Sequence, residues 1–411
     1  MYRERCIEKS MRRDRICWCR RTRHCITLQP MTALPPSLDP PTRLLCGPGP
    51  SNVSPDVLAA MQRPMLGHLD PDMHAIMAEV VQLLRGVYRA DAGLVIPLQA
   101  TGSSGMEAGL ANLLEPGDTA IVGVNGFFGA RIVDIARRCG AEVVQVSEPF
   151  GRHVPNDRLL DALDRHPDAK LLAVVHAETS TGVEHPLREL GLMLRDHDVL
   201  LMADCVTSLG GVELDFDGWG IDYAYSCTQK CVAAPPGMSP IAVSDRALER
   251  IRARTTPVPF SLDLLALEKF WVQRPPVYHH TAPILHIYAL HAALRAIAIE
   301  GLEARWARHD EVGQFFQQQV LDRGLGLLAE PDHQLAPLTA VRVPDGVDGP
   351  AVQRRMLGDH GIEIGGGLGP DAPPIWRVGL MGYNATIATA QRVLDGLDAT
   401  LTDQHAHARV A

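Results

Sequence analysis

Short apolar runs alternate with amphipathic stretches between Ala92 and about Ser244. Apolar runs of four to eight residues bounded by polar or turn residues indicate buried β-strands. The predicted strands are Leu94–Leu98, Thr119–Val124, Glu142–Val146, Leu171–Ala177, Val199–Asp204, Tyr223–Cys227 and Pro240–Val243. The predicted helices are Met106–Leu114, Gly129–Cys139, Asp157–His166 and Leu187–Asp196. This alternation predicts an α/β fold in which a mostly parallel sheet lies between helices.

A second, smaller α/β pattern begins at about Glu303, with a helix through Phe315 and a strand at Leu338–Val343. A chain of 411 residues is long enough for two or three domains. We therefore predict a disordered basic tail with a proline-rich linker at residues 1–42, a large domain at 43–302, a small C-terminal domain at 303–400 and a tail at 401–411. Ligands of parallel α/β sheets bind beyond the carboxyl ends of strands, so strand-to-helix turns are the places to search.

The first 30 residues are rich in arginine and hold four of the nine cysteines, Cys6, Cys17, Cys19 and Cys25. Their spacing fits none of the common zinc patterns well, even with His24 included, and implies no disulfide framework. Three interpretations stay open: a disordered tail, an upstream extension of a chain that starts near Met31, or a mitochondrial transit peptide, against which the acidic residues argue. The sequence as a whole predicts no metal site.

Charge and hydropathy exclude two classes of partner. The formal net charge is −9 and no basic cluster lies beyond the N-terminal segment, which argues against a nucleic-acid-binding face. The apolar runs are far shorter than the roughly 20 residues of a membrane helix, so we expect no membrane span. Lysine is scarce beside arginine, as in proteins of GC-rich bacteria, and the C-terminus is not a peroxisomal signal, which favours a cytoplasmic protein.

Lysine occurs only four times, so each position can be weighed separately. Lys9 lies in the basic tail, Lys170 precedes a strand in a polar turn, and Lys269 falls on a predicted helix surface. Lys230 instead lies between a strand end and the segment Ala234–Gly237, in which two prolines and a glycine impose a turn. A lysine desolvated there would lose part of its preference for the ammonium form and become a usable nucleophile and base. The alternative is a surface lysine after a strand.

Asp204 ends the apolar run Leu200–Asp204. A carboxylate at the end of a buried strand is costly unless it meets a cation or hydrogen-bond donors. The protonated ring nitrogen of pyridoxal phosphate is such a cation, and its charge makes the ring an electron sink. Asp204 and Lys230 would then face one cofactor from two strands of the same sheet. The alternative for Asp204 is a helix cap or a turn.

The turn Thr101–Gly105 lies between a predicted strand and a predicted helix. Backbone N–H groups and hydroxyls at a helix N-terminus form a phosphate cradle, and glycine permits close approach. The motif is neither a Walker loop nor a dinucleotide-binding fingerprint. Many helices begin with Ser and Gly without binding anything, so the turn alone is a weak signal. Phosphate without a nucleotide is what pyridoxal phosphate offers.

In this order, the segments resemble the alanine-glyoxylate and serine-pyruvate aminotransferases, which are class V aminotransferases with the type I pyridoxal-phosphate fold. The resemblance extends from Leu44 to about Thr400. The blocks that carry it are Gly47–Ser51, Glu107–Ala108, Asn125–Gly126, His176–Gly182, Ser208–Gly211, Gln229–Lys230 with Ala234–Gly237, Tyr278–Thr281 and Arg377–Gly379. It implies pyridoxal 5'-phosphate as the cofactor and a fold with a large cofactor-binding domain and a smaller C-terminal α/β domain.

The resemblance implies two catalytic residues, Lys230 as the lysine that binds the cofactor in an imine and Asp204 as the partner of its ring nitrogen. It places Phe128 on the face of the pyridine ring and Thr179 at its edge. The residues implied to bind the phosphate within the subunit are Thr101, Gly102, Ser103 and Gln229.

Other implied contacts involve the substrate and a second subunit. Arg377 would clamp the substrate carboxylate with two hydrogen bonds, as guanidinium geometry allows, and Gly49 would lie beside the substrate. Tyr278 and Thr281 would reach the cofactor phosphate of a neighbouring subunit, which implies a homodimer with shared active sites. The sequence departs from animal members of the family at Ser103, Phe128 and Thr179, where they have histidine, tryptophan and serine.

The implied reaction is transamination of a small amino acid, alanine or serine, with a small 2-oxo acid, glyoxylate or pyruvate, in two half-reactions. The alternatives are a sister transaminase acting on ureidoglycine, aminoethylphosphonate or pyridoxamine, and a non-catalytic pyridoxal-phosphate-binding protein. A cysteine desulfurase would need a reactive cysteine well after the lysine, and none follows Cys231. The loop Gly365–Gly369 is either a plain turn or a mobile segment over the site, and Tyr278-His279-His280 lacks a third ligand for a metal.

Overall fold

The computed structural model describes residues 36–408, and from Arg43 onward they form one compact unit. The predictions for Cys6, Cys17, Cys19 and Cys25, and for most of the basic tail, lie outside the described residues. Helix α12, Ile387–Ala408, continues through the predicted boundary at residue 400. The predicted division into domains is otherwise not tested and stays a prediction.

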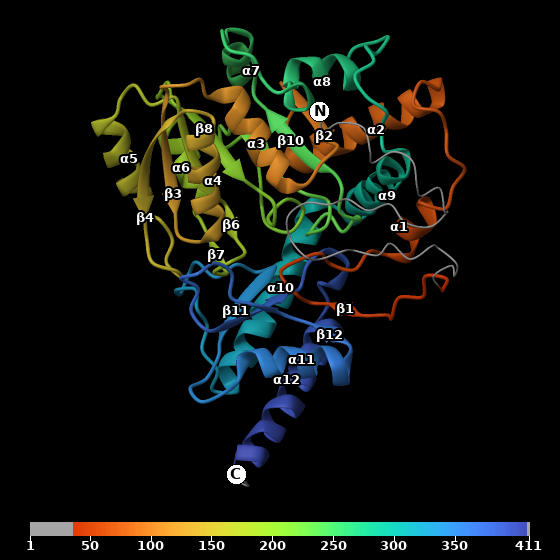
Figure 1. Cartoon of the computed structure of the whole chain (residues 1–411), viewed down its shortest axis with the longest axis vertical. Helices are drawn as coiled ribbons and strands as arrows, with labels where there is room; N and C mark the ends of the chain where they lie inside the picture. The colour runs from red at the N-terminus through yellow and green to blue at the C-terminus, as the bar shows by residue number, and fades with distance from the viewer. Residues whose placement is uncertain (1–35, 409–411) are drawn as a thin grey trace, which may run out of the picture. The chain divides into compact units, whose positions relative to one another are not determined.

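The central sheet has seven strands in the order β2-β10-β9-β8-β5-β3-β4 (Figure 1). The strands from β9 to β4 pair in parallel, and β10 is antiparallel to both β9 and β2. The prediction of a mostly parallel sheet flanked by helices is therefore confirmed. In chain order the strands are β2 Leu94–Leu98, β3 Thr119–Val124, β4 Glu142–Ser147, β5 Leu171–Val175, β8 Leu200–Asp204, β9 Tyr223–Tyr225 and β10 Ser239–Val243.

Strand β10 runs against its neighbours because no helix joins it to β9. A parallel return usually needs a helical crossover, whereas residues 226–238 form only turns. The predicted strand Tyr223–Cys227 accordingly ends at Tyr225, where these turns begin. Lys230 lies in this connection, at the edge of the sheet where β8 and β9 end.

The predicted strand Leu171–Ala177 also ends early, at Val175. Beyond it, β6 Ala177–Glu178 leaves the central sheet and pairs with β7 Val183–Glu184 in a separate antiparallel hairpin. Gly182, with φ of +74°, provides the left-handed backbone that this turn needs. The hairpin brings Glu178 and Thr179 to the same edge of the sheet as the turn after β3.

Helices flank the sheet where buried side chains recur every three or four residues, as in α5 with Leu159, Ala162 and Leu163. Helix α3 begins at Gly102 rather than at the predicted Met106, because Thr101 already has the extended backbone of an N-cap. The helices of this part are α1 Pro55–Ala60, α2 Pro71–Tyr88, α3 Gly102–Leu113, α4 Phe127–Arg138, α5 Asn156–Arg165, α6 Leu187–Met193, α7 Asp245–Arg252, α8 Leu264–Trp271 and α9 Ile284–Glu300.

The C-terminal elements form a second α/β layer, drawn in blue in Figure 1. Strand β14, Ile375–Gly379, pairs with β11, Leu338–Arg342, on one side and with β13, Gly365–Gly366, on the other. Helices α10, Leu302–Asp322, and α11, Gly349–His360, cover these strands together with α12. The strand β1, Leu44–Leu45, pairs with β12, Ile362–Glu363, and therefore belongs to this C-terminal layer.

Helices α9 and α10 follow one another in the chain and meet at 88°. Neither is long and apolar enough to cross a membrane by itself, and only the bent pair together passes a test of length and composition. Half of the α9 residues, Leu290 and Leu294 among them, are buried in the core of the protein.

Two glycines allow α3 to lie directly on the sheet. A Cβ at Gly105 would come within 2.1 Å of Ser239 Oγ, and one at Gly109 within 2.4 Å of Tyr223 Cε1. The Tyr223 hydroxyl donates to the Gly105 carbonyl at 2.8 Å, which fixes the helix against β9. The N-terminus of α3 is thereby held beside the ends of β8 and β9.

We predict that Gly109→Ala lowers the free energy of unfolding by about 1–3 kcal/mol, because the added methyl overlaps a buried ring. Gly358→Ala is the matched control, since its Cβ would meet nothing within 4 Å in the exposed part of α11. It should stabilise the protein by roughly 0.5–1 kcal/mol through helix propensity. Urea unfolding followed by circular dichroism compares the two, and equal midpoints would contradict the packing described.

Candidate active site

Three of the predicted site segments meet where β8 and β9 end. A Cβ at Gly102 would lie 3.1 Å from Val206 Cγ2 and 3.3 Å from Cys227 Cβ, so the first turn of α3 touches the segments that follow both strands. Asp204 and Lys230 each shift the pKa of the other, as neighbouring opposite charges do. The structure therefore brings Gly102, Asp204 and Lys230 together, as the sequence predicts.

Lys230 is 8% exposed and its ammonium donates a hydrogen bond to the Pro48 carbonyl. Among the described residues it forms no salt bridge. Burial lowers the pKa of the Lys230 amine, because the charged form loses its hydration. The amine is thus more readily deprotonated than an exposed lysine, which is what a nucleophile and base requires.

Gly49 makes room for this lysine. Its φ of +106° lies in the region that favours glycine, and a Cβ there would be 2.5 Å from Lys230 Cδ and 2.8 Å from Lys230 Nζ. Gly49 therefore lies against the reactive end of the lysine, and its predicted role beside the substrate stays a prediction.

Asp204 is 2% exposed at the end of β8. Its carboxylate accepts hydrogen bonds from the Tyr225 hydroxyl at 2.6 Å and from the Val206 N–H at 2.9 Å. Burial raises the pKa of Asp204 to about 6, and these bonds oppose the rise. No salt bridge to Asp204 occurs in the described part of the chain, so this buried carboxylate remains able to pair with a cation.

The first turn of α3 presents a site for an anion. Thr101 is the N-cap and its side chain makes no capping bond, while the intrahelical bonds begin with the N–H groups of Ser104 and Gly105. Gln229 directly precedes Lys230, and its buried Oε1 has no hydrogen-bond partner among the described residues. Ser103 is exposed and accepts a bond from Arg131 at 3.0 Å.

Arg377 in β14 is 6% exposed, and its guanidinium donates to two carbonyls, of Gly366 at 2.6 Å and of Thr179 at 3.3 Å. A buried guanidinium usually pairs with a carboxylate, yet no salt bridge to Arg377 occurs among the described residues. Burial lowers its pKa to about 10, and the nearby Glu178 carboxylate opposes that shift. The guanidinium therefore keeps donors for a carboxylate supplied from outside the chain.

The loop after Glu363 is not a plain turn throughout. Gly365 and Gly366 form the edge strand β13 beside Arg377, and the Gly366 carbonyl fixes the guanidinium. A Cβ at Gly365 would lie 2.5 Å from Pro48 Cδ, so this strand also packs against the segment that holds Lys230. The glycines are thus explained by close packing at the site.

Phe128 and Thr179 lie on neighbouring segments joined through Glu178. Phe128 is the second residue of α4, and its N–H donates to Glu178 Oε2 at 3.0 Å. Thr179, 2% exposed, follows Glu178 and offers its carbonyl to Arg377. The roles predicted for both side chains stay predictions, but their positions are coupled to that of Arg377.

Tyr278 and Thr281 are exposed, and the Tyr278 ring is 59% accessible beside His68. The segment touches Gln99, two residues before Thr101, through a hydrogen bond that the Gln99 side-chain amide donates to His280. The chain alone does not bring Tyr278 and Thr281 into the group around Lys230, so their predicted role toward a second subunit stays a prediction.

Sequence reasoning gave no role to Tyr225, Pro48, Glu178 or Arg131. Tyr225 is the register partner of Asp204 in the parallel pair β8–β9, so the two side chains face the same side of the sheet. That register is not visible in the sequence. The contacts of Pro48, Glu178 and Arg131 join distant segments and leave no local signal.

A separate group, His153, Glu330 and His333, has ligand atoms within 4.8 Å of one another. The two imidazoles are stacked with centroids 3.6 Å apart and planes inclined by 15°. An ion lies close to the plane of each ring that binds it, and two ring planes at that spacing and inclination meet only far beyond metal-ligand distance. The group is a hydrogen-bonded stack, with Glu330 bound to His153 Nδ1 at 2.6 Å.

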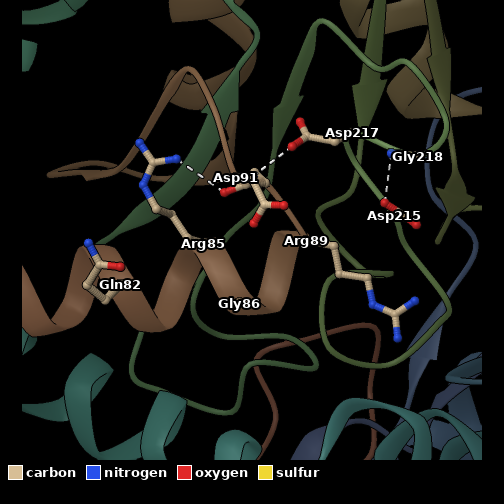
Figure 2. A pocket seen from close by; sticks show the side chains of 9 residues that line it. Gln82, Arg85, Gly86, Arg89, Asp91, Asp215, Asp217 and Gly218 are labelled. Atoms are coloured by element: carbon tan, nitrogen blue, oxygen red, sulfur yellow. Dashed lines mark hydrogen bonds between the residues drawn. The ribbon is translucent and has the colours of Figure 1, made fainter.

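A surface hollow of about 660 Å³ lies between the end of α2 and the turn at Asp215–Gly218 (Figure 2). Figure 2 shows Arg85 and Asp91 at this hollow, where the Asp91 N–H donates to Asp217 at 2.7 Å. None of the predicted site residues lines it. The hollow is thus separate from the site around Lys230.

The residues around Lys230 fit pyridoxal phosphate. A buried amine, a buried carboxylate without a cationic partner, an open helix N-terminus and an aromatic ring at Phe128 match its aldehyde, ring nitrogen, phosphate and ring face. The free donors of Arg377 are available to an anion, and the unpartnered Gln229 Oε1 is available to a hydrogen-bond donor. This donor set offers no comparable place for a nucleotide.

Residues 45–382 match the family described as aminotransferase class-V. The chain is 39% identical to the alanine–glyoxylate aminotransferase of Rattus norvegicus, over 91% of each chain, and 35% identical to the (S)-ureidoglycine–glyoxylate transaminase of Bacillus subtilis, over 89% of this chain and 92% of that protein. The crystal structure of an alanine–glyoxylate aminotransferase from Nostoc sp. has 46% identity and a TM-score of 0.87, covering 90% of this chain and 98% of that one.

We predict that Gly49→Ala weakens binding of pyridoxal phosphate on the order of tenfold, since a positive φ alone costs about 1–2 kcal/mol in a non-glycine residue. The added methyl would also displace the Lys230 side chain. Gly67→Ala is the control, because its Cβ would meet nothing within 4 Å. Titration of the cofactor-free protein, followed by absorbance, measures both; equal affinities would show that Lys230 does not need the space at Gly49.

Proposed function

Because this chain belongs to the class V aminotransferases, which are pyridoxal phosphate enzymes, we propose that it transfers the amino group of alanine or serine to glyoxylate or pyruvate. The observation that carries the proposal is the presence of two buried cations, Lys230 and Arg377, in one site without a salt bridge among the described residues. Burial lowers the pKa of both side chains, and the nearby Arg377 guanidinium lowers that of Lys230 further. A substrate with a carboxylate beside its amine offers an anion to the Arg377 guanidinium and an α-carbon proton to the Lys230 amine.

The choice of substrates is supported by the relatives. Alanine–glyoxylate aminotransferases of Mus musculus and Drosophila melanogaster are 40% and 38% identical to this chain over most of its length. A small substrate also suits the close approach of Gly49 and Gly365 to Lys230 and Pro48, which leaves little space beside the amine.

The chain's own residues divide the work. Arg377 holds the substrate carboxylate, and the backbone carbonyls of Gly366 and Thr179 fix the guanidinium plane. The Lys230 amine removes the proton from the α-carbon of the amino donor. In the second half-reaction it returns a proton to the α-carbon that comes from the 2-oxo acid. Asp204 keeps its negative charge toward the ring nitrogen, and the bound cofactor supplies an electron sink for the α-carbon. Amino donor and acceptor react in turn at the same residues.

We predict that Lys230→Ala abolishes the visible absorbance of the lysine-bound cofactor and lowers kcat by at least about 10²–10⁴-fold, the usual contribution of a general base. Lys269→Ala is the control, an exposed lysine on α8. Absorbance spectra and alanine–glyoxylate turnover measure both. A Lys230→Ala protein that kept band and turnover would exclude Lys230 as the catalytic lysine.

Arg377→Ala is expected to raise KM for the amino acid by roughly 10–100-fold, because hydrogen bonds to a charged group contribute about 1.5–3 kcal/mol. Arg377→Lys should recover only part of the loss, since an ammonium cannot form the two-pronged clamp. Arg354→Ala, at a side chain 71% exposed, is the control. Unchanged steady-state kinetics of Arg377→Ala would remove this residue from the site.

A second candidate is ureidoglycine–glyoxylate transamination, favoured by the Bacillus subtilis enzyme's structure, which has 36% identity and a TM-score of 0.87. Pyridoxamine–pyruvate transamination has a more distant relative, at 27% identity. A panel of alanine, serine, ureidoglycine and pyridoxamine as donors, each with glyoxylate and pyruvate, separates the three. The donor with the highest kcat/KM identifies the activity.

The proposal includes a homodimer in which Tyr278 and Thr281 complete the neighbouring site, supported by the exposed Tyr278 ring. Mixing Lys230→Ala with Tyr278→Ala chains tests it, because a mixed dimer would then contain one site with both residues intact. Activity should exceed the sum of the two separate proteins after unfolding and joint refolding. No gain in a mixture shown to contain mixed dimers would place Tyr278 in its own subunit's site.

A further inference from the structure

Glu178 is a fully buried carboxylate, 0% exposed, at the edge of the site. Oε2 accepts the N–H groups of Phe128 at 3.0 Å and Gly129 at 3.2 Å. Oε1 accepts the N–H of Ser180 at 3.0 Å and its hydroxyl at 2.6 Å. Three of these donors are backbone N–H groups, which cannot accept a proton in return, so the geometry suits the ionised carboxylate.

These bonds join two separate segments. The N-cap of α4 is Gly126, which has no side chain to cap the helix, and a Cβ there would lie 2.5 Å from Glu178 Cδ. Glu178 instead satisfies the N–H groups of the first turn, and Ser180 Oγ accepts that of Phe127 at 2.9 Å. A negative charge at a helix N-terminus is favourable because it faces the positive end of the helix dipole.

The two segments carry different parts of the site. Helix α4 carries Phe128, and the hairpin after β6 carries Thr179, whose carbonyl holds Arg377. Glu178 is also the acid whose charge acts on the Arg377 guanidinium, and it acts on Asp204 as well. The Glu178 carboxylate thus bonds to the segment that carries Phe128. Its charge also acts on Arg377 and on Asp204.

We propose that Glu178 is a positioning residue whose carboxylate clamps the start of α4 to the hairpin after β6, and so holds Phe128 against the cofactor ring in register with Thr179 and Arg377. Glu178 does not touch the substrate and acts through Phe128. The inference rests on the proposed function of the site as a pyridoxal phosphate site.

The test is a double-mutant cycle on cofactor binding. Glu178→Gln keeps the shape of the side chain but turns an N–H donor toward the backbone N–H groups. In the otherwise unchanged protein it should raise the Kd for pyridoxal phosphate about tenfold and reduce the visible circular dichroism of the bound cofactor, since two charge-assisted bonds are lost. In a Phe128→Ala background the same change should raise Kd by no more than about twofold, because coupled residues are non-additive.

A structural role alone would act equally in both backgrounds, so an equal fold-change overturns the proposal, as does an unchanged Kd in Glu178→Gln. Glu142→Gln, at an exposed position of β4, is the matched control and should change neither readout. If Glu178→Gln does not fold, Ser180→Ala removes one donor and leaves the carboxylate, and should raise Kd about twofold to threefold; no change there would equally reject the proposal.

Cofactor binding and circular dichroism do not depend on which amino donor the enzyme uses. Failure of the proposed function would appear as an absence of transaminase turnover in the unchanged protein. Failure of the Glu178 proposal would appear as an absence of coupling between Glu178 and Phe128 while the unchanged protein still binds the cofactor and turns over. The two results are therefore distinguishable.

Discussion

The site depends on the burial of charged side chains at one edge of the sheet. Lys230, Arg377, Asp204 and Glu178 are each at most 8% exposed, yet none forms a salt bridge within the described residues. Taking such charges out of water is costly, and the protein offsets the cost with backbone groups: carbonyls of Pro48, Gly366 and Thr179 for the cations, and N–H groups for the acids. The hydrogen-bonding capacity that remains on these side chains is available to a cofactor and a carboxylate substrate.

Hydrogen bonds to backbone groups require that the chain segments around the site keep fixed positions. Close packing of these segments provides that rigidity. The connection from β9 to β10 makes turns instead of a helix, which leaves Lys230 at the end of the sheet. Glycines at 49, 102 and 365 let the segments that surround this lysine pack without intervening side chains. Strand β14 brings Arg377 from the C-terminal layer to the same place, so residues about 150 positions apart in sequence lie in one site.

Much of this could be predicted from the sequence, because periodicity and strand-end chemistry are local. Strands such as Thr119–Val124 have the predicted bounds, and Asp204 lies at the end of a buried strand as predicted. The hydrogen bonds from Glu178 to the start of α4 could not be predicted, since they join distant segments. The antiparallel β10 and the early start of α3 were missed although their causes, a connection without a helix and the N-cap at Thr101, are local. The roles of individual site residues, the homodimer and the cytoplasmic location stay predictions.

The most direct measurement identifies the lysine that binds the cofactor. Reduction of the purified enzyme with borohydride fixes pyridoxal phosphate to its lysine, and peptide mapping by mass spectrometry locates the label. With Lys230 buried beside Asp204 and Arg377, the label should lie on Lys230 alone. A label on Lys170 or Lys269, both exposed, would contradict the assignment of this site.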